Sequence, residues 1–222
     1  MLGQTVAHIG ETRISNDWGN TEGRELVVDT YLARTARNLD FTPEQWNLII
    51  GSLLGDGTLV RTTRGCAFRV NHGIKQKDYA DWKYEKLKDF TNSPPNFAEN
   101  CYYFRTVTHD ALTALRAQFY PNGKKGVPRE LIASRMNPFL LAVWIMDDGS
   151  KDKYQIRINS QSFSEEDNQF LANVLRAKLG IETTINHDKN FFRLRVAESS
   201  MRILIESVRP YIIPSMLYKF SL

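Results

Sequence analysis

Two short apolar runs, each ending in aspartate and glycine, decide how this chain folds. The first is Ile49-Ile50-Gly51-Ser52-Leu53-Leu54-Gly55-Asp56-Gly57, and the second is Leu141-Ala142-Val143-Trp144-Ile145-Met146-Asp147-Asp148-Gly149. A helix that ends in aspartate is electrostatically unfavourable, because the C-terminal end of the helix dipole is already negative. If two such ends meet, carboxylates and dipoles crowd one spot, and a divalent cation is the usual remedy. The two runs therefore predict a shared catalytic metal site.

Each apolar run follows a recognisable helix start. Thr42-Pro43-Glu44 offers threonine as the N-cap and proline at the first helical position, and Asn137-Pro138 opens the second run in the same way. We predict one helix from Pro43 to Gly55 or Asp56. The second helix is predicted from the Asn137-Pro138 pair to Asp147 or Asp148.

The segments after each run repeat in the same order. Phe68-Arg69-Val70-Asn71 matches Ile156-Arg157-Ile158-Asn159 at an offset of 88 residues. Phe104-Arg105-Thr106-Val107 resembles Arg193-Leu194-Arg195-Val196 at 89, and Tyr120-Pro121 matches Arg209-Pro210 at 89. Matches at nearly constant offset, with the Asp-Gly runs 92 residues apart, indicate an internal duplication.

Each repeat reads as helix, two strands, helix, two strands, helix. Besides the motif helices, helical patterns cover residues 24–37, 77–90, 110–119, 164–179 and 199–208. We predict an α+β fold of two pseudo-symmetric αββαββα halves, each with a four-stranded antiparallel sheet. The predicted organisation is an N-terminal extension over 1–40, a first half over 41–133 and a second half over 134–222.

Alternation along the strands gives each sheet a polar face. Phe68 and Val70 point one way while Arg69 and Asn71 point the other. In the second half, Ile156 and Ile158 alternate in the same manner with polar residues at 157, 159 and 161, so the strand is expected to continue to Gln161. The simplest interpretation is a solvated face; the repeated Arg-x-Asn favours a DNA surface, because these side chains contact guanine and adenine. The predicted DNA contacts are Arg61, Arg69, Asn71, Arg105, Arg157, Asn159, Gln161, Arg193 and Arg195. Arg64 and Lys75 are candidates for phosphate contacts.

Composition sets only broad limits. The 222 residues carry 29 Lys+Arg against 25 Asp+Glu, a net charge of +4 that suits nucleic acid without requiring it. Cys66 and Cys101 suggest no disulfide framework, and the four isolated histidines do not predict a zinc site. No apolar stretch reaches the roughly 20 residues that cross a bilayer. With no signal-peptide core over residues 1–13, we expect an intracellular protein of a bacterial or archaeal cytoplasm or of an organelle.

Both runs resemble the LAGLIDADG motif of the homing endonucleases, in its two-motif, single-chain form. The similarity extends over roughly residues 41–220 and includes Lys124-Lys125-Gly126-Val127-Pro128, Asn159-Ser160-Gln161-Ser162-Phe163 and Pro210-Tyr211-Ile212-Ile213-Pro214 through Lys219. The resemblance implies that the motif helices pack side by side between the halves. Small residues at Gly51, Ser52, Gly55 and Ala142 suit that close approach, whereas Val143 and Trp144 make it less symmetric. It also implies that two saddle-shaped sheets lie along the DNA major groove.

The resemblance also implies the chemistry. Asp56 and Asp148 fall at the second acidic position of the motif, where they would hold Mg²⁺, with Mn²⁺ as a substitute and Ca²⁺ binding without turnover. Gly55 and Asp147 precede them and complete the expected metal set, Asp147 as a structural residue or weak ligand. Lys125 and Lys219 match the basic residue that such enzymes carry near each active site, with Lys124 as a competitor. The alternative is that Lys125 and Lys219 are ordinary surface lysines with no catalytic role. His72 and His109 are expected at a strand edge or a helix start.

Three functions remain open from the sequence. The first is a monomeric, Mg²⁺-dependent, site-specific endonuclease that cuts both strands of double-stranded DNA. The second is a non-cleaving nucleic-acid binder, such as an intron maturase or a domesticated DNA-binding protein. The third, a metal-dependent enzyme acting on another phosphate, requires the repeat to be accidental. The presence of both motif aspartates and both lysines favours the nuclease.

Overall fold

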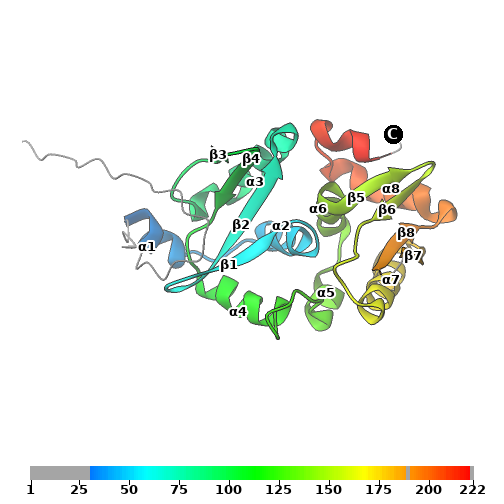
Figure 1. Cartoon of the computed structure of the whole chain (residues 1–222), viewed down its shortest axis with the longest axis horizontal. Coiled ribbons are helices and arrows are strands. Elements are labelled where there is room, and N and C mark those ends of the chain that lie inside the picture. The colour runs from blue at the N-terminus through cyan, green and yellow to red at the C-terminus, as the bar shows by residue number, and fades with distance from the viewer. Residues whose placement is uncertain (1–30, 189–190, 221–222) are drawn as a thin grey trace, which may run out of the picture.

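The chain folds into two halves with the same order of elements (Figure 1). The computed structural model describes residues 31–188 and 191–220. After α1 (Tyr31–Arg37), the first half contains α2 (Pro43–Leu54), β1 (Thr58–Thr62), β2 (Gly65–Gly73), α3 (Lys77–Leu87), β3 (Asn96–Ala98), β4 (Cys101–Arg105), α4 (Asp110–Phe119) and α5 (Arg129–Arg135). The second half contains α6 (Pro138–Asp148), β5 (Gly149–Asp152), β6 (Gln155–Ile158), α7 (Glu165–Leu179), β7 (Thr183–Asp188), β8 (Phe191–Val196) and α8 (Met201–Val208).

Both motif helices begin at the predicted caps. The Thr42 hydroxyl accepts a hydrogen bond from the backbone N–H of Gln45, whose side chain accepts one from the N–H of Thr42. The Asn137 side chain accepts from the N–H of Leu140 in the same role. Each cap satisfies backbone donors that a helix start leaves unpaired. Local sequence therefore sets where α2 and α6 begin.

The other predicted helices form with small differences at their ends. The helix expected over 77–90 ends at Leu87, and residues 88–90 continue as a tighter 3₁₀ turn. α7 follows its N-cap Ser164 and stops at Gly180, whose φ of +67° suits glycine. A 3₁₀ turn over 198–200 precedes α8.

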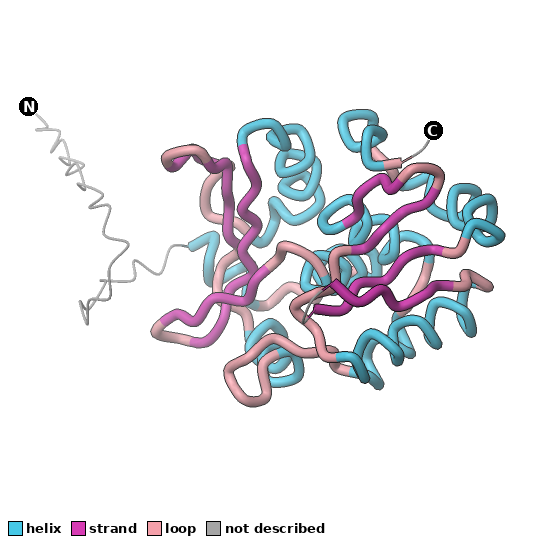
Figure 2. The backbone as a smooth tube through the Cα atoms, turned by 45° about the vertical axis from the view of Figure 1, so that its right-hand side comes forward, coloured by secondary structure: helices cyan, strands magenta, loops and turns pink. Residues whose placement is uncertain are grey.

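The sheets confirm the predicted α+β architecture. The first sheet has the strand order β1-β2-β4-β3 and the second β5-β6-β8-β7, with neighbouring strands antiparallel. Helices α3 and α4 pack on the first sheet and α7 on the second. Figure 2 shows the strands as two separate groups, each backed by helices.

The motif helices α2 and α6 pack against each other between the two sheets (Figure 1). A Cβ atom at Gly51 would lie 2.7 Å from the carbonyl oxygen of Leu140 and 2.9 Å from the Cβ of Val143. At Gly55 an added Cβ would lie 2.4 Å from the Cβ of Asp147. Glycine is therefore needed at both positions for the helices to approach this closely. The helix packing is asymmetric, as predicted, because Gly51 of α2 faces the larger side chain of Val143 on α6.

Strand alternation agrees with the prediction in the first half and ends early in the second. Phe68 and Val70 on β2 are buried, whereas Arg69 is half-buried and Asn71 is exposed. The expected continuation of β6 to Gln161 is wrong, because β6 ends at Ile158. The backbone N–H of Ser160 donates a hydrogen bond to the carbonyl oxygen of Ile158, so a turn replaces the strand.

The N-terminal extension is only partly described. Ala33 and Ala36 of α1 form a small buried cluster with Val107 beside the first sheet. Residues 1–30, including the predicted helical segment 24–30, lie outside the described residues. α5 was not predicted, and it carries the chain across the predicted boundary between 133 and 134. Among the described residues, no helix is both long and apolar enough to span a membrane.

Candidate metal centre and nucleic-acid interface

The ends of α2 and α6 bring the motif aspartates together. Asp56 follows Gly55, the C-cap of α2, and its side chain is 46% exposed, whereas Asp148 is the last residue of α6 and is half-buried. Asp147 lies beside them with its side chain fully buried. Three carboxylates thus gather where two helices present their negative dipole ends, which is the crowding that the sequence predicts.

The pKa values of the carboxyl groups in this cluster reflect that crowding. Burial raises the pKa of Asp148 to about 7, and the negative charges of Asp56 and Asp147 act in the same direction. Burial and then the charge of Asp147 also raise the pKa of Asp56. The nearby lysines act against both effects. A cation at this point would remove the repulsion, because it favours the ionised carboxylates.

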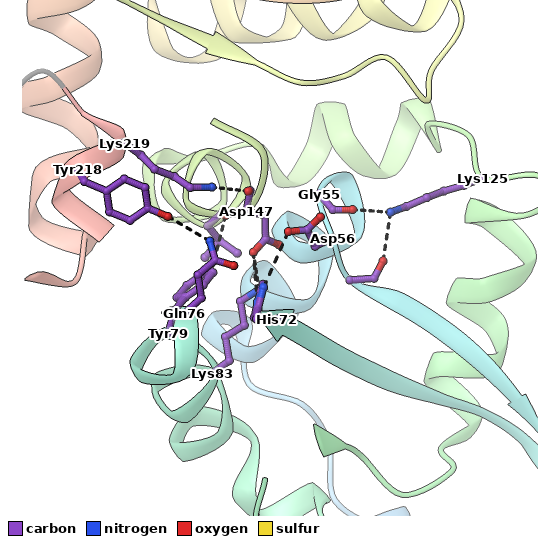
Figure 3. A network of polar contacts seen from close by, with 12 residues as sticks. Gly55, Asp56, His72, Gln76, Tyr79, Lys83, Lys125, Asp147, Tyr218 and Lys219 are labelled. Carbon is purple, nitrogen blue, oxygen red and sulfur yellow. Dashed lines mark hydrogen bonds and ion pairs between the residues drawn. The ribbon is translucent and has the colours of Figure 1, made fainter. Parts of the chain in front are cut away.

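The two predicted lysines make corresponding contacts, one in each half. Lys125 Nζ donates hydrogen bonds to the carbonyl oxygens of Gly55 at 2.7 Å and Gly57 at 3.1 Å. Lys219 Nζ donates to the carbonyl oxygen of Asp147, which occupies the position equivalent to Gly55 (Figure 3). Burial lowers the pKa of both lysines, and the carboxylates of the cluster counteract this. Lys124, the competitor of Lys125, is exposed.

A buried network joins Asp147 to the first half. Lys83 Nζ on α3 lies 2.6 Å from Asp147 Oδ1 and 3.3 Å from His72 Nε2 on β2. His72 Nδ1 in turn lies 3.9 Å from Asp56 Oδ2. Figure 3 shows these side chains converging from α3, β2 and the two motif helices. The site is therefore built from both halves.

His72 and Lys83 are the residues that sequence reasoning missed. His72 was expected at a strand edge or helix start, but it is buried on β2, one of the two inner strands, and continues the inward face of Phe68 and Val70. Lys83 lies on the buried face of α3 with Tyr79, at a spacing of four residues. The signal in the sequence was that a lysine occupies a position on the apolar face of this helix, where a buried partner of opposite charge is expected. His109, by contrast, is the N-cap of α4, which confirms the helix-start alternative.

The donor set fits a hard divalent cation. Carboxylate and carbonyl oxygens are the ligands that Mg²⁺ and Ca²⁺ prefer, and Asp56, Asp148 and the carbonyls of Gly55 and Asp147 supply them. One carboxylate oxygen, Asp147 Oδ2, is buried with no hydrogen-bond partner among the described residues. Asp56, His72 and Asp147 also have ligand atoms within 4.8 Å of one another. The residues present therefore suit a metal centre.

Both sheets carry a pair of arginines at equivalent register positions. Arg69 on β2 lies opposite Arg105 on β4, and Arg157 on β6 lies opposite Arg195 on β8. In the second sheet, the Asp152 carboxylate accepts hydrogen bonds from both Arg157 and Arg195. These ion pairs lower the pKa of Asp152, Arg157 making the largest contribution. The duplication thus extends from the helices to the polar sheet faces.

The remaining predicted DNA contacts differ in their setting. Arg61, Asn71, Arg105 and Gln161 are exposed, and Asn159 and Arg193 are half-buried. Arg64 lies in the turn between β1 and β2, and Lys75 lies in a 3₁₀ turn after β2, also exposed. Asn159 and Gln161 lie beyond the end of β6, so they belong to a loop rather than to the sheet. Their roles in DNA binding stay predictions.

Comparison with known sequences gives several relatives. The model of the LAGLIDADG DNA endonuclease family matches residues 46–204. Protein RecA of Mycolicibacterium chitae is 30% identical over 223 residues, which cover 90% of this chain and 52% of that protein. The cytochrome b mRNA maturase bI2 of Saccharomyces cerevisiae is 31% identical, covering 79% of this chain and 47% of the maturase. The chain therefore spans about half the length of these two relatives.

Another relative matches over most of its own length. Probable intron-encoded endonuclease 1 of Wickerhamomyces canadensis is 27% identical, covering 79% of this chain and 83% of that protein.

Solved structures share the fold. The homing endonuclease I-WcaI bound to its DNA recognition sequence superposes with a TM-score of 0.80 at 24% identity, covering 89% of this chain and 96% of that chain. I-DmoI in complex with DNA and Mn gives a TM-score of 0.53 at 12% identity, covering 77% of this chain and 99% of that one. Since the family model spans well over half of the sequence and the architecture agrees, this chain belongs to the LAGLIDADG DNA endonuclease family.

Proposed function

We propose that this protein is a monomeric, site-specific homing endonuclease that hydrolyses both strands of double-stranded DNA with Mg²⁺ held between Asp56 and Asp148. One observation carries the proposal. Each half supplies a motif aspartate and a lysine that donates a hydrogen bond to the backbone carbonyl of the residue preceding that aspartate. Two such units at one interface suit two phosphodiester cleavages, one on each strand. Family membership and the DNA-bound relatives are consistent with this function.

The chain's own groups have distinct roles in this proposal. Asp56 and Asp148 bind the cation, which when bound polarises the scissile phosphate and lowers the pKa of water. Lys125 and Lys219 are close enough to the same helix ends to stabilise charge that develops on a phosphate or to orient water. Deprotonation of Asp148 accompanies cation binding, because its pKa is raised to about 7.

Binding of DNA is assigned to the polar sheet faces. The arginine pairs Arg69–Arg105 and Arg157–Arg195 are positioned on equivalent strands of the two sheets. Phosphate contacts by such side chains give affinity that falls steeply with salt, whereas contacts with base edges give specificity. Bound DNA would then lie across both sheets, with its scissile phosphates near the ends of α2 and α6.

The test begins with a supercoiled plasmid library that carries randomised target sites. Wild-type protein with Mg²⁺ should linearise a small subset of plasmids, and EDTA should prevent this. Asp56→Asn should abolish linearisation of the selected target, while its DNA affinity in Ca²⁺ stays within about tenfold of wild type, because the sheets are unchanged. Asp40→Asn, the same charge change at an exposed position, serves as the control.

The products discriminate between outcomes. Linear plasmid indicates cleavage of both strands, whereas accumulation of nicked circles indicates that one unit is inactive. Cleavage by Asp56→Asn at the wild-type rate would show that the metal assignment is wrong.

A maturase role is the second candidate, because the bI2 maturases of two yeasts are among the relatives. It predicts nucleic-acid binding without linearisation of any plasmid in the library.

A further inference from the structure

The buried ammonium of Lys83 lies at the centre of a group of potential metal ligands. Asp56, His72 and Asp147 present oxygen and nitrogen atoms within 4.8 Å of one another, and Lys83 Nζ contacts two of the three. Figure 3 shows the Lys83 side chain entering this group from α3. A lysine here therefore takes up ligand atoms that a metal ion would otherwise use.

Burial lowers the pKa of Lys83, and nearby groups offset part of the cost of burying its charge. Its side chain is fully buried, and the Tyr79 ring lies 4.3 Å from the ammonium, which adds a cation–π contact. The ion pair with Asp147 at 2.6 Å crosses from the first half to the second. A lysine this deep needs a close counterion, because burial alone strongly disfavours the ammonium.

Asp147 has no counterpart in the first half. The equivalent residue is Gly55, and an added Cβ there would collide with the Cβ of Asp147. The Asp147 side chain thus lies in the space between the two halves. Lys83 and His72 of the first half both contact its Oδ1 atom. Left unpaired, this carboxylate would be a third acidic ligand beside Asp56 and Asp148.

We propose that Lys83 is a positioning residue that sets which cations the centre accepts. Its ammonium neutralises Asp147 and occupies Asp147 Oδ1 and His72 Nε2, which leaves a divalent ion the carboxylates of Asp56 and Asp148 and the backbone carbonyl of Asp147. Without Lys83, two carboxylates and an imidazole form a site for transition metals, which bind nitrogen-containing sites more tightly than Mg²⁺ does. The inference rests on the proposed cation site between Asp56 and Asp148.

The test is a Co²⁺ titration of DNA-free protein followed by visible absorption. Lys83→Met keeps the length of the side chain and removes its charge. This variant should bind Co²⁺ at least about tenfold more tightly than wild type, with ligand-field bands that depend on nitrogen ligation. The double variant Lys83→Met/His72→Gln should lose that gain, which a purely structural role of Lys83 would not predict.

Two results would overturn the proposal. One is unchanged Co²⁺ affinity in Lys83→Met. The other is wild-type Co²⁺ binding that His72→Gln alone removes, because His72 would then be a ligand despite Lys83. If Lys83→Met is unfolded in EDTA, Co²⁺ should restore its far-ultraviolet circular dichroism, and failure to do so also counts against the proposal.

A third variant separates charge from packing. Lys83→Met/Asp147→Asn removes both partners of the buried pair and leaves no uncompensated charge. It should fold without metal and bind Co²⁺ no more tightly than wild type; tight binding by this variant would contradict the role of Asp147. None of these readouts uses DNA, so an absence of plasmid cleavage would reject the proposed nuclease function and leave the assignment of Lys83 to be decided on its own.

Discussion

Replacing Asp148 with asparagine should stabilise the metal-free protein while removing its cleavage activity. Asp148 is half-buried beside Asp56 and Asp147, and its pKa is raised from 3.8 to about 7. Ionising it in the folded state is therefore unfavourable. Asparagine has nearly the same shape and carries no charge, so the repulsion disappears. Lys125 and Lys219 face the same cluster and offset part of the repulsion in wild type.

The size of the effect follows from the two pKa values. The interval from 3.8 to about 7 corresponds to roughly 4 kcal/mol, since a tenfold change in proton affinity is worth about 1.4 kcal/mol. Solvent screening of a half-buried group reduces this, and we expect about 2 kcal/mol. In a protein of this size that raises the melting temperature by about 4–8 °C.

The pH dependence has a defined sign. Below pH 3.8 Asp148 is protonated in both states and the substitution has no electrostatic effect. Between 3.8 and about 7 the unfolded chain releases the proton first, so wild type loses stability as the pH rises. The advantage of Asp148→Asn should therefore grow over this interval and stay constant above it.

Thermal unfolding in EDTA at pH 4, 6 and 8 measures this difference. Addition of Mg²⁺ at pH 8 should raise the melting temperature of wild type and leave that of Asp148→Asn nearly unchanged. An Asp148→Asn protein that is less stable than wild type in EDTA at pH 8, or whose advantage does not depend on pH, would refute the reasoning.

Three further changes test the helix interface, the lysines and the sheet face. Lys125→Met should slow plasmid cleavage at least about 100-fold with little change in DNA affinity, whereas Lys124→Met should cleave normally; equal rates would argue against the assignment. Gly51→Ala should cost about 1–3 kcal/mol in urea unfolding, because its Cβ would meet Leu140 and Val143, and Gly126→Ala, with open space around it, should not. Arg69→Ala should reduce the slope of log affinity against log salt by about one, and an unchanged slope would exclude a phosphate contact.

Much of the fold was predictable because its signals are local. Caps at Thr42 and Asn137 set the starts of the motif helices, and alternation along β2 set the polar face of the first sheet. The limit of β6 was not predictable from alternation, because the turn at Ser160 depends on hydrogen bonds that form only in the folded chain. The helix α5 was missed for a different reason: it is short, and no side chain caps its start, so its sequence carries little local signal.

The sequence by itself indicated the duplication and the two motif aspartates, and its resemblance to the LAGLIDADG motif added the lysine expected beside each of them. Only the tertiary structure decided the partners of Asp147. Lys83 is 64 residues away from it in the chain, and His72 lies on a different element of the first half. Helical and strand periods report which face of an element is buried, but not which buried groups meet across an interface. That pairing follows from the close approach of α2 and α6 at Gly55, which directs the Asp147 carboxylate into the first half.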